Sequence, residues 1–319
     1  MAKNTPRIKT TAMRGPLQST HFVVVTYNGE AFIENCIHAI RAETPSSPIH
    51  VIDNGSQDKT LSILNSLGIS PIKTNENLGF GKANNIGISK ALSLNAEHVF
   101  LINQDAYLEK DSLIRFFDKP ESKHIALHAF LQLNGTGDRL DSQFRSRYLR
   151  HEFCSNFFED LYFNKPKPIY TIAFANAAAW LMPRELLLKV GGFNPSFFHY
   201  GEDDNYVHRL HHHGYELLLH PDCLVHHDRE DRPQSEFFND SQSKERLFLQ
   251  RISLPSNDSD AAHIMRKTRS NFWKKRIRGH SKESIIETIH LDFLRRTPIG
   301  GIIKHRNMTK NQGPHFLEI

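Results

Sequence analysis

Short apolar segments alternate with amphipathic segments through the first third of the chain. The apolar segments are rich in β-branched residues, which predicts strands buried in a sheet. These expected strands cover residues 21–28, 49–54, 70–74 and 98–103. Between them, apolar residues recur at helical spacing and predict helices at 30–41, 58–67 and 82–94. Such alternation with short connections predicts an α/β fold with a mostly parallel sheet flanked by helices.

The pattern loosens beyond residue 124. Further strands are expected at 125–133, 170–182, 216–219 and 223–226, with helices at 185–190 and 202–213. Residues 138–168 are aromatic and basic without a clear period, which suits a loop or short helices. Beyond about residue 230 the chain becomes polar, with helical patterns near 240–252, 260–278 and 282–295. We therefore expect a flexible leader at 1–19, an α/β domain at 20–230 and a basic helical region at 231–319.

The composition is that of a soluble globular protein, because 39% of the residues are hydrophobic and 24% are charged. No segment approaches the roughly 18 apolar residues of a membrane-spanning helix, and the N-terminus lacks the apolar core of a signal peptide. The three cysteines are widely spaced, which argues against a disulfide framework and a zinc module. A cytoplasmic location is the expectation.

Positive charge is concentrated near the end of the chain, where residues 266–278 read RKTRSNFWKKRIR. Such a segment suits an anionic membrane surface or nucleic acid, and a solvated helix face explains it equally well. No nucleic-acid-reading motif accompanies it, so no nucleic-acid partner is expected. Trp273 among Lys274, Lys275 and Arg276 suits a peripheral position on the inner face of an anionic membrane. Homodimerisation through the C-terminal helices is equally compatible with the sequence.

Polar side chains follow the expected strands at their carboxyl ends, where parallel sheets bind ligands. These residues are Thr26, Tyr27, Asn28, Asp53, Asn54, Asn103, Gln104 and Asp105. Asp53 could accept hydrogen bonds from a base or ribose, or it could cap the next helix. Asp105 could hold a divalent ion that bridges two phosphates, although strand ends also carry Asp for turns.

Gly79 and Gly81 open a helix whose N-terminal amides could face a diphosphate, with Lys82 adding positive charge. The order of glycines differs from the dinucleotide-binding fingerprint. Glu202, Asp203 and Asp204 begin another helix. Acidic residues there stabilise the helix dipole, but three neighbouring acids also repel one another and raise a pKa, as a general base requires.

The histidines are numerous, but their spacing limits what they can bind. Residues 211–213 form a run of three that would end a helix, where the side chains point in different directions and cannot chelate one ion together. His226 and His227 end a strand, so they face opposite sides and only one can reach a given site.

Taken together, these segments resemble the inverting family 2 glycosyltransferases of the GT-A fold, especially bacterial rhamnosyltransferase-like members. The matching segments are VVVTYN (23–28), VIDNGSQD (51–58), NLGFGKANNIG (77–87), LINQD (101–105), GGFNPSFFHYGEDDNYVHRL (191–210) and PDCLVHH (221–227). Their order and separation agree with the family over residues 20–228.

The resemblance implies a role for each matching residue. Thr26, Tyr27, Asn28 and Glu30 fall where the family binds the nucleotide base, and Asp53 falls on the carboxylate that contacts base or ribose. Asn103, Gln104 and Asp105 fall on the metal motif, which implies Mg²⁺ or Mn²⁺. Asp203 falls on the catalytic base, paired with Glu202. His227 falls on the late metal-binding histidine, and a one-residue slip would select His226.

Two departures from the family pattern stand out. Asn103 replaces the first Asp of the metal motif, and Asn205 replaces the usual second acid after the Glu-Asp pair. The implied function is still inverting transfer of a sugar from dTDP-rhamnose or a UDP-sugar to a glycan or lipid-linked acceptor, in cell-surface polysaccharide synthesis. A degenerate, non-catalytic scaffold is one alternative. A sugar nucleotidyltransferase is the other, but it would carry a glycine-rich basic loop where residues 26–32 read TYNGEAF.

Overall fold

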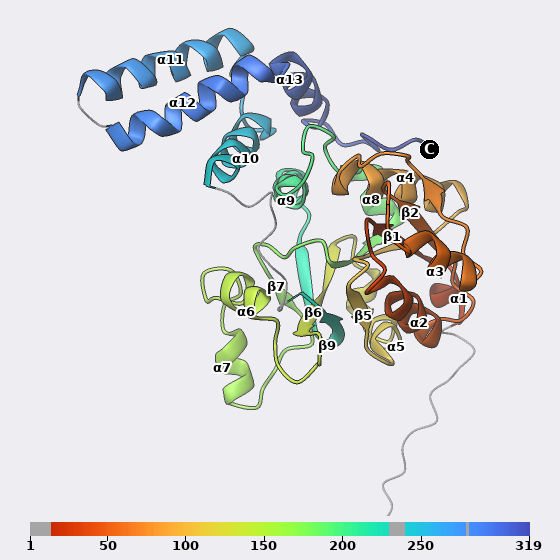
Figure 1. Ribbon diagram of the computed structural model, residues 1–319. Helices are drawn as coiled ribbons and strands as arrows, with labels where there is room; N and C mark the ends of the chain where they lie inside the picture. The colour runs from red at the N-terminus through yellow and green to blue at the C-terminus, as the bar shows by residue number, and fades with distance from the viewer. Residues whose placement is uncertain (1–13, 230–239, 279–280) are drawn as a thin grey trace, which may run out of the picture.

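The computed structural model describes residues 14–229, 240–278 and 281–319. Within these ranges nine strands form one sheet in the order β3-β2-β1-β4-β8-β6-β9-β5, with β7 paired to β9 (Figure 1). The strands are β1 (Thr20–Thr26), β2 (Ile49–Asp53), β3 (Ile72–Lys73), β4 (His98–Ile102), β5 (Ala106–Leu108), β6 (Leu127–Asn134), β7 (Tyr170–Thr171), β8 (Ala179–Pro183) and β9 (Leu217–His227).

The sheet is mostly parallel. Strands β1, β2, β3, β4, β6 and β9 run in one direction, whereas β5, β7 and β8 run against them. The carboxyl ends of β1, β2, β4, β6 and β9 therefore meet along one edge. This edge brings together residues that lie far apart in the sequence, and it is where a ligand is expected to bind.

Helices cover both faces of the sheet. Those of the α/β part are α1 (Arg14–Gln18), α2 (Ile33–Glu43), α3 (Thr60–Ser66), α4 (Phe80–Ser93), α5 (Ser112–Phe117), the 3₁₀ helix η1 (Pro120–Lys123), α6 (Ser142–Tyr148), α7 (Phe157–Tyr162), α8 (Arg184–Val190) and α9 (Glu202–His212). Alternate residues of β1 face opposite sides. Phe22 packs in one core with Ile37 of α2, and Val23 packs in the other with Ile88 of α4.

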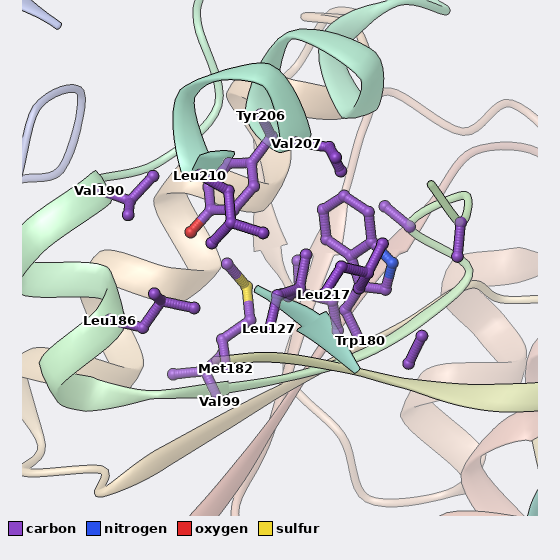
Figure 2. Close-up of a cluster of buried hydrophobic side chains, with 14 of the residues drawn as sticks. Val99, Leu127, Trp180, Met182, Leu186, Val190, Tyr206, Val207, Leu210 and Leu217 are labelled. Atoms are coloured by element: carbon purple, nitrogen blue, oxygen red, sulfur yellow. The ribbon is translucent and has the colours of Figure 1, made fainter. Parts of the chain in front are cut away.

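The core that contains Val23 also holds α9, the helix that carries the acidic cluster. Trp180 and Met182 of β8 lie beneath α8 and α9, in contact with a cluster that includes Tyr206 and Leu210 (Figure 2). All four side chains are fully buried. Burying large apolar side chains stabilises a fold by about 1.5–3 kcal/mol each, so α9 is fixed on the sheet by its apolar side.

The C-terminal helices form a smaller core of their own. They are α10 (Asp240–Ser253), α11 (Ala261–Ile277), α12 (Ser281–Arg296) and α13 (Ile299–Met308). Phe197, from the loop before α9, inserts into this core beside Phe248 and Phe293. Helices α11 and α12 pair as a hairpin that projects away from the sheet (Figure 1). None of the described helices combines the length and apolar composition of a membrane crossing.

The observed elements follow the expected order of strands and helices, with several corrections. The strand expected at 170–182 is two strands, β7 and β8, which pair with different partners, and helix α5 was not expected. Arg14–Gln18 form helix α1, whose Leu17 packs against the core, so this part of the expected leader is folded; residues 1–13 lie outside the described ranges. The strands expected at 216–219 and 223–226 are one strand, β9, with a bulge at 221–223. Strand β5 and helix α13 were not expected, because one is three residues long and the other begins Ile-Gly-Gly.

Candidate functional site

Strand β5 places Asp105 beside His227. The strand pairs antiparallel with β9, so Ala106 lies opposite His227, and the Asp228 amide donates to the Asp105 carbonyl at 2.9 Å. As a result, Asp105 Oδ1 and His227 Nε2 are 3.7 Å apart. Both side chains are buried, with 6% and 2% of their surface exposed. A carboxylate and an imidazole from two strands thus converge at the carboxyl edge of the sheet.

Gln132 fixes the proton of His227. The imidazole Nδ1 lies 3.0 Å from Gln132 Oε1. An amide oxygen only accepts hydrogen bonds, so Nδ1 is the donor here, and in the neutral imidazole the lone pair is on Nε2, on the side of Asp105. The Gln132 amide donates to Asn176 Oδ1 at 2.9 Å, which sets its orientation. A neutral histidine oriented in this way is the usual form of a metal ligand. A single Gln inside an apolar strand carries no sequence signal, and we did not expect it.

His226 points to the other face of the strand. Its ring lies 3.4 Å from Glu109 and packs against Gly137. The alternation expected from the sequence therefore holds, and His227 is the histidine that reaches Asp105. Among the described residues, no three His, Cys, Asp or Glu side chains cluster as a complete metal site. Asn103, two residues before Asp105, has its side-chain oxygen buried without a hydrogen-bond partner among these residues.

The acidic cluster begins α9 at the end of the aromatic loop. Glu202 is 4% exposed, and its Oε2 has no hydrogen-bond partner in the described part of the chain. Burial, and then the negative charge of Asp203, raises the pKa of Glu202. Burial, and then the charge of Asp204, raises the pKa of Asp203 to about 7. A carboxylate with such a pKa can take up a proton at neutral pH, as a general base must.

Helix α6 connects the two halves of the site. Arg229 follows His227 and makes a two-point ion pair with Asp141, the N-cap residue of α6, at 2.9 and 2.5 Å. Against the lowering effect of burial, the bond to Asp141, together with the negative charge of Asp105, raises the pKa of Arg229, and the charge of Arg229 in turn acts on Tyr148 at the other end of α6. Burial, and then the charge of Asp203, raises the pKa of Tyr148. Arg229 and Tyr148 are site residues that sequence reasoning missed, because only tertiary contacts bring them here.

The expected base-binding residues tie together the loops after β1, β2 and β4. Gln104 Oε1 accepts from Thr26 Oγ1 at 2.6 Å and from the Tyr27 amide at 3.1 Å. Asn28 Oδ1 accepts from the Gln57 amide, and a Glu30 carboxylate oxygen accepts from the Lys59 amide. The Tyr27 ring is 44% exposed at this rim. These bonds give the loops after β1 and β2 a fixed shape.

Asp53 and Asn54 occupy the end of β2. Asp53 is 2% exposed, and its Oδ1 lies 3.4 Å from the Ser56 amide. This is a turn contact, as expected if Asp53 stabilises the start of the next segment rather than a bound base. Asn54 Oδ1 accepts from the Leu78 amide at 2.9 Å, and its Nδ2 donates to Asn77 and Gly79. Asn54 thereby shapes the loop that leads into α4.

The start of α4 at Gly79 and Lys82 lies beside the loop before α9, and the diphosphate site expected there stays a prediction. Gly79 has a φ of +84°, and a Cβ there would lie 1.9 Å from the carbonyl oxygen of Phe198. The first amide of α4, that of Phe80, donates to this same oxygen at 3.2 Å. Lys82 is exposed, and its charge acts on His305 of α13. Gly79 is thus required by the close approach of the loop before α9, which covers this end of α4.

The family comparison covers the strands that build this edge except β9. The model of Glycosyl transferase family 2 matches residues 21–187, more than half of the chain. The chain belongs to glycosyl transferase family 2. The matched region contains Asp53 and Asp105, whereas Asp203 and His227 lie beyond it. No curated protein sequence matches this chain.

Solved structures of transferases share the fold at low identity. S. aureus TarS 1-349 in complex with UDP-GlcNAc aligns over 91% of this chain and 90% of its own, with a TM-score of 0.52 and 15% identity. GalNAc-T7 with UDP, GalNAc and Mn²⁺ aligns over 92% of this chain but 55% of its own (TM-score 0.59, 14%). The glucosyl-3-phosphoglycerate synthase of Mycobacterium tuberculosis, with Mn²⁺, UDP and phosphoglyceric acid, aligns over 76% and 80% (0.50, 16%).

These likenesses establish the fold, and the expected GT-A architecture is confirmed. Family membership also confirms the glycosyltransferase part of the resemblance. The rhamnosyltransferase-like specificity remains a prediction.

In this family 2 chain, the loop that begins at Gly191 and Gly192 (the Gly-Gly loop) leads to the acidic cluster and is held in place by hydrogen bonds from α4 and from the C-terminal segment. Asn85 of α4 donates to the Phe193 carbonyl at 2.8 Å and accepts from its amide at 2.7 Å. The Gly192 amide donates to the His315 carbonyl at 2.8 Å, and Leu317 packs into the core beneath. The segment 313–318 therefore lies against the loop that leads to Glu202.

Replacing Gly192 with alanine is expected to lower the free energy of unfolding by about 1–3 kcal/mol. A Cβ there would lie 2.4 Å from Asn85 Oδ1 and 2.7 Å from Leu317 Cδ2, and Asn85 cannot move without losing its bonds to Phe193. Chemical denaturation measures the loss. The control is Gly301→Ala in α13, where the new methyl meets open space and alanine is the better helix former. Equal stability of Gly192→Ala and the parent chain would contradict this account of the loop.

Proposed function

We propose that this chain transfers a sugar from a nucleotide diphosphate donor, a UDP-sugar or dTDP-rhamnose, to a hydroxyl of a glycan or lipid-linked acceptor, with inversion. One observation carries the proposal. In a family 2 sheet, the Asp105–His227 pair lies at the carboxyl edge, and the pKa of Asp203, at the start of a helix on the same sheet, is raised as a general base requires. The UDP, UDP-GlcNAc and Mn²⁺ named for the structural neighbours support a nucleotide-sugar donor and a divalent ion.

The acid cluster supplies the base of a single displacement. Asp203 accepts the proton of the acceptor hydroxyl while that oxygen attacks the anomeric carbon. The bond from this carbon to the diphosphate breaks at the same time, and its electron pair leaves with the diphosphate. Attack from the face opposite the leaving group inverts the anomeric configuration. Burial also raises the pKa of Glu202, the neighbour of Asp203 in the first turn of α9.

The residues at the strand edge fit a divalent cation. Asp105 and His227 offer an oxygen and a nitrogen that Mg²⁺ or Mn²⁺ accepts, and the pair leaves coordination positions for diphosphate oxygens and water. The bound ion would neutralise charge that develops on the leaving diphosphate. Gln132 keeps the His227 lone pair available, and Arg229, anchored by Asp141, adds a fixed positive charge near Asp105.

The alternative of a non-catalytic scaffold rests on Asn103 and Asn205, the two positions that depart from the family pattern. Asn205 accepts from Arg209 Nε at 3.2 Å, and the same guanidinium donates to the Val190 carbonyl at 2.6 Å. Asn205 is fully buried and belongs to the network that orients the Gly-Gly loop. An asparagine at this position therefore has a structural use that does not require loss of activity.

A panel of nucleotide sugars in a thermal-shift assay tests the proposal. With Mn²⁺ present, at least one UDP- or dTDP-sugar is expected to raise the Tm, and chelation should remove the shift because diphosphate and ion bind together. Adding an acceptor should then release the nucleoside diphosphate and give a glycoside of inverted configuration. A protein that binds no nucleotide sugar, or that forms a product of retained configuration, would rule the proposal out.

A further inference from the structure

The outer side of the α11–α12 hairpin combines cations with two large exposed apolar side chains. Helix α11 and the residue after it carry seven Lys and Arg between 266 and 278, and residues 261–278 contain no Asp or Glu. Lys275 faces α12 and pairs with Glu287 at 3.0 Å. The other six form no ion pair with any residue that the structure describes. The hairpin thus presents a concentrated positive charge.

The geometry of α11 places its apolar side chains in the middle of this charge. Ile264 and Thr268 are buried and mark the inner side of the helix. At about 100° per residue, Trp273 lies about 180° from Ile264, directly opposite the packed side. Trp273 is 58% exposed and Ile277, one turn on, is 81% exposed. The pattern of a surface helix is here reversed, because apolar side chains stand where polar ones are normal.

The cations border this apolar stripe on both sides. By the same helical geometry, Arg269 and Arg276 lie on one side of Trp273, and Lys267 and Lys274 lie on the other. Arg266 lies along the stripe itself. Helix α11 forms the outer layer of the hairpin, with α12 between most of it and the sheet, and it also contacts α13 (Figure 1). A flat surface could therefore meet this face without meeting the sheet.

We infer that this face of α11, defined by Arg266, Lys267, Arg269, Trp273, Lys274, Arg276 and Ile277, docks on an anionic lipid bilayer. Trp and Ile enter the boundary between headgroups and acyl chains, and flanking cations attract anionic headgroups. Nucleic acid would engage the cations but not the exposed Ile277. A second copy on the same face would oppose like charges, which is unfavourable. The inference goes beyond the proposed transfer reaction and does not rest on it.

Vesicle co-sedimentation of the full chain tests the inference. The protein is expected to pellet with phosphatidylglycerol-containing vesicles at low salt, to stay in solution with phosphatidylcholine alone, and to be released by high salt. Changing Arg266, Arg269 and Lys274 together to Gln should lower partitioning on the order of 100-fold, since each cation near such a surface contributes about five-fold. Trp273→Ala should lower it on the order of ten-fold.

Matched variants away from the hairpin provide the control. Lys110, Lys123 and Lys165 are exposed, and changing all three to Gln removes the same charge. Tyr162 is an 84% exposed aromatic residue on α7, so Tyr162→Ala removes a comparable apolar group. Both variants are expected to bind vesicles like the parent chain. If the triple Gln variant loses binding as the hairpin variants do, net charge rather than this face is responsible. If Tyr162→Ala loses binding, the apolar contact lies on α7. Either result overturns the inference.

Tryptophan emission locates the contact. The chain has two Trp residues, and Trp180 is fully buried, so vesicle insertion should shift the emission of Trp273 to shorter wavelength. Absence of pelleting, pelleting without this shift, or binding of nucleic acid in place of vesicles would each overturn the inference. Transfer to a water-soluble acceptor should be unchanged in the hairpin variants, so failure here leaves the proposed reaction untouched.

Discussion

Replacing Asp203 with asparagine is expected to lower the rate of sugar transfer by about 10²–10⁴-fold, the usual contribution of a general base. The amide has the shape of the carboxylate but cannot take up the acceptor proton. Donor binding, measured by the Mn²⁺-dependent shift in Tm, should be nearly unchanged, because the proposed donor contacts lie on other residues. An Asp203→Asn enzyme with the parent rate would refute the assignment of the base.

Asp204 provides a matched control in the same helical turn. Asp203 must be ionised to act, and its pKa is raised to about 7, by burial first and by Asp204 second. The rate should therefore fall as the pH drops through this value. Asp204→Asn removes a negative charge, so it should lower the Asp203 pKa and move the acidic limb of the pH profile to lower pH while activity is retained. A limb that does not move would contradict the coupling.

Changing Asp105 to asparagine is expected to cost about 10²–10³-fold in turnover, because stabilisation of the leaving diphosphate by a bound ion contributes several kcal/mol. His227→Ala should raise the Mn²⁺ concentration needed for activity by at least about ten-fold. His226→Ala is the control one residue away, because His226 faces Glu109 on the other side of β9. Titration of activity with Mn²⁺ measures all three variants. Equal effects of His226→Ala and His227→Ala would argue against a metal site at this edge.

The alternation of apolar and amphipathic segments was sufficient to predict β1 through β4 and the helices between them. Apart from β3, which has two residues within the apolar segment 70–74, those elements are long or strongly periodic, and the helices each bury one side against the sheet. Strand β5 was not predictable in this way, because three residues show no period. The position of Asp105 beside His227 depends on β5, so the sequence could nominate both residues without placing them together.

The choice between His226 and His227 illustrates a second limit of predicting the site from the sequence. Strand alternation says that only one of them faces a given site, but the bulge at 221–223 sets which one. Bulges depend on the pairing partner, here β6. Gln132 and Arg229 escaped prediction because their partners, His227 and Asp141, are close only in the folded chain. The approach of Phe198 to Gly79 likewise depends on a loop that is distant in sequence and cannot be read from α4 alone.

The most direct measurement is the anomalous scattering of Mn²⁺ in crystals grown with Mn²⁺ and UDP. The account predicts one strong peak within coordination distance of an Asp105 carboxylate oxygen and His227 Nε2, with the UDP diphosphate on the ion and the Asp203 carboxylate facing the site where the sugar would lie. UDP bound at another edge of the sheet, or a manganese peak away from both Asp105 and His227, would contradict it.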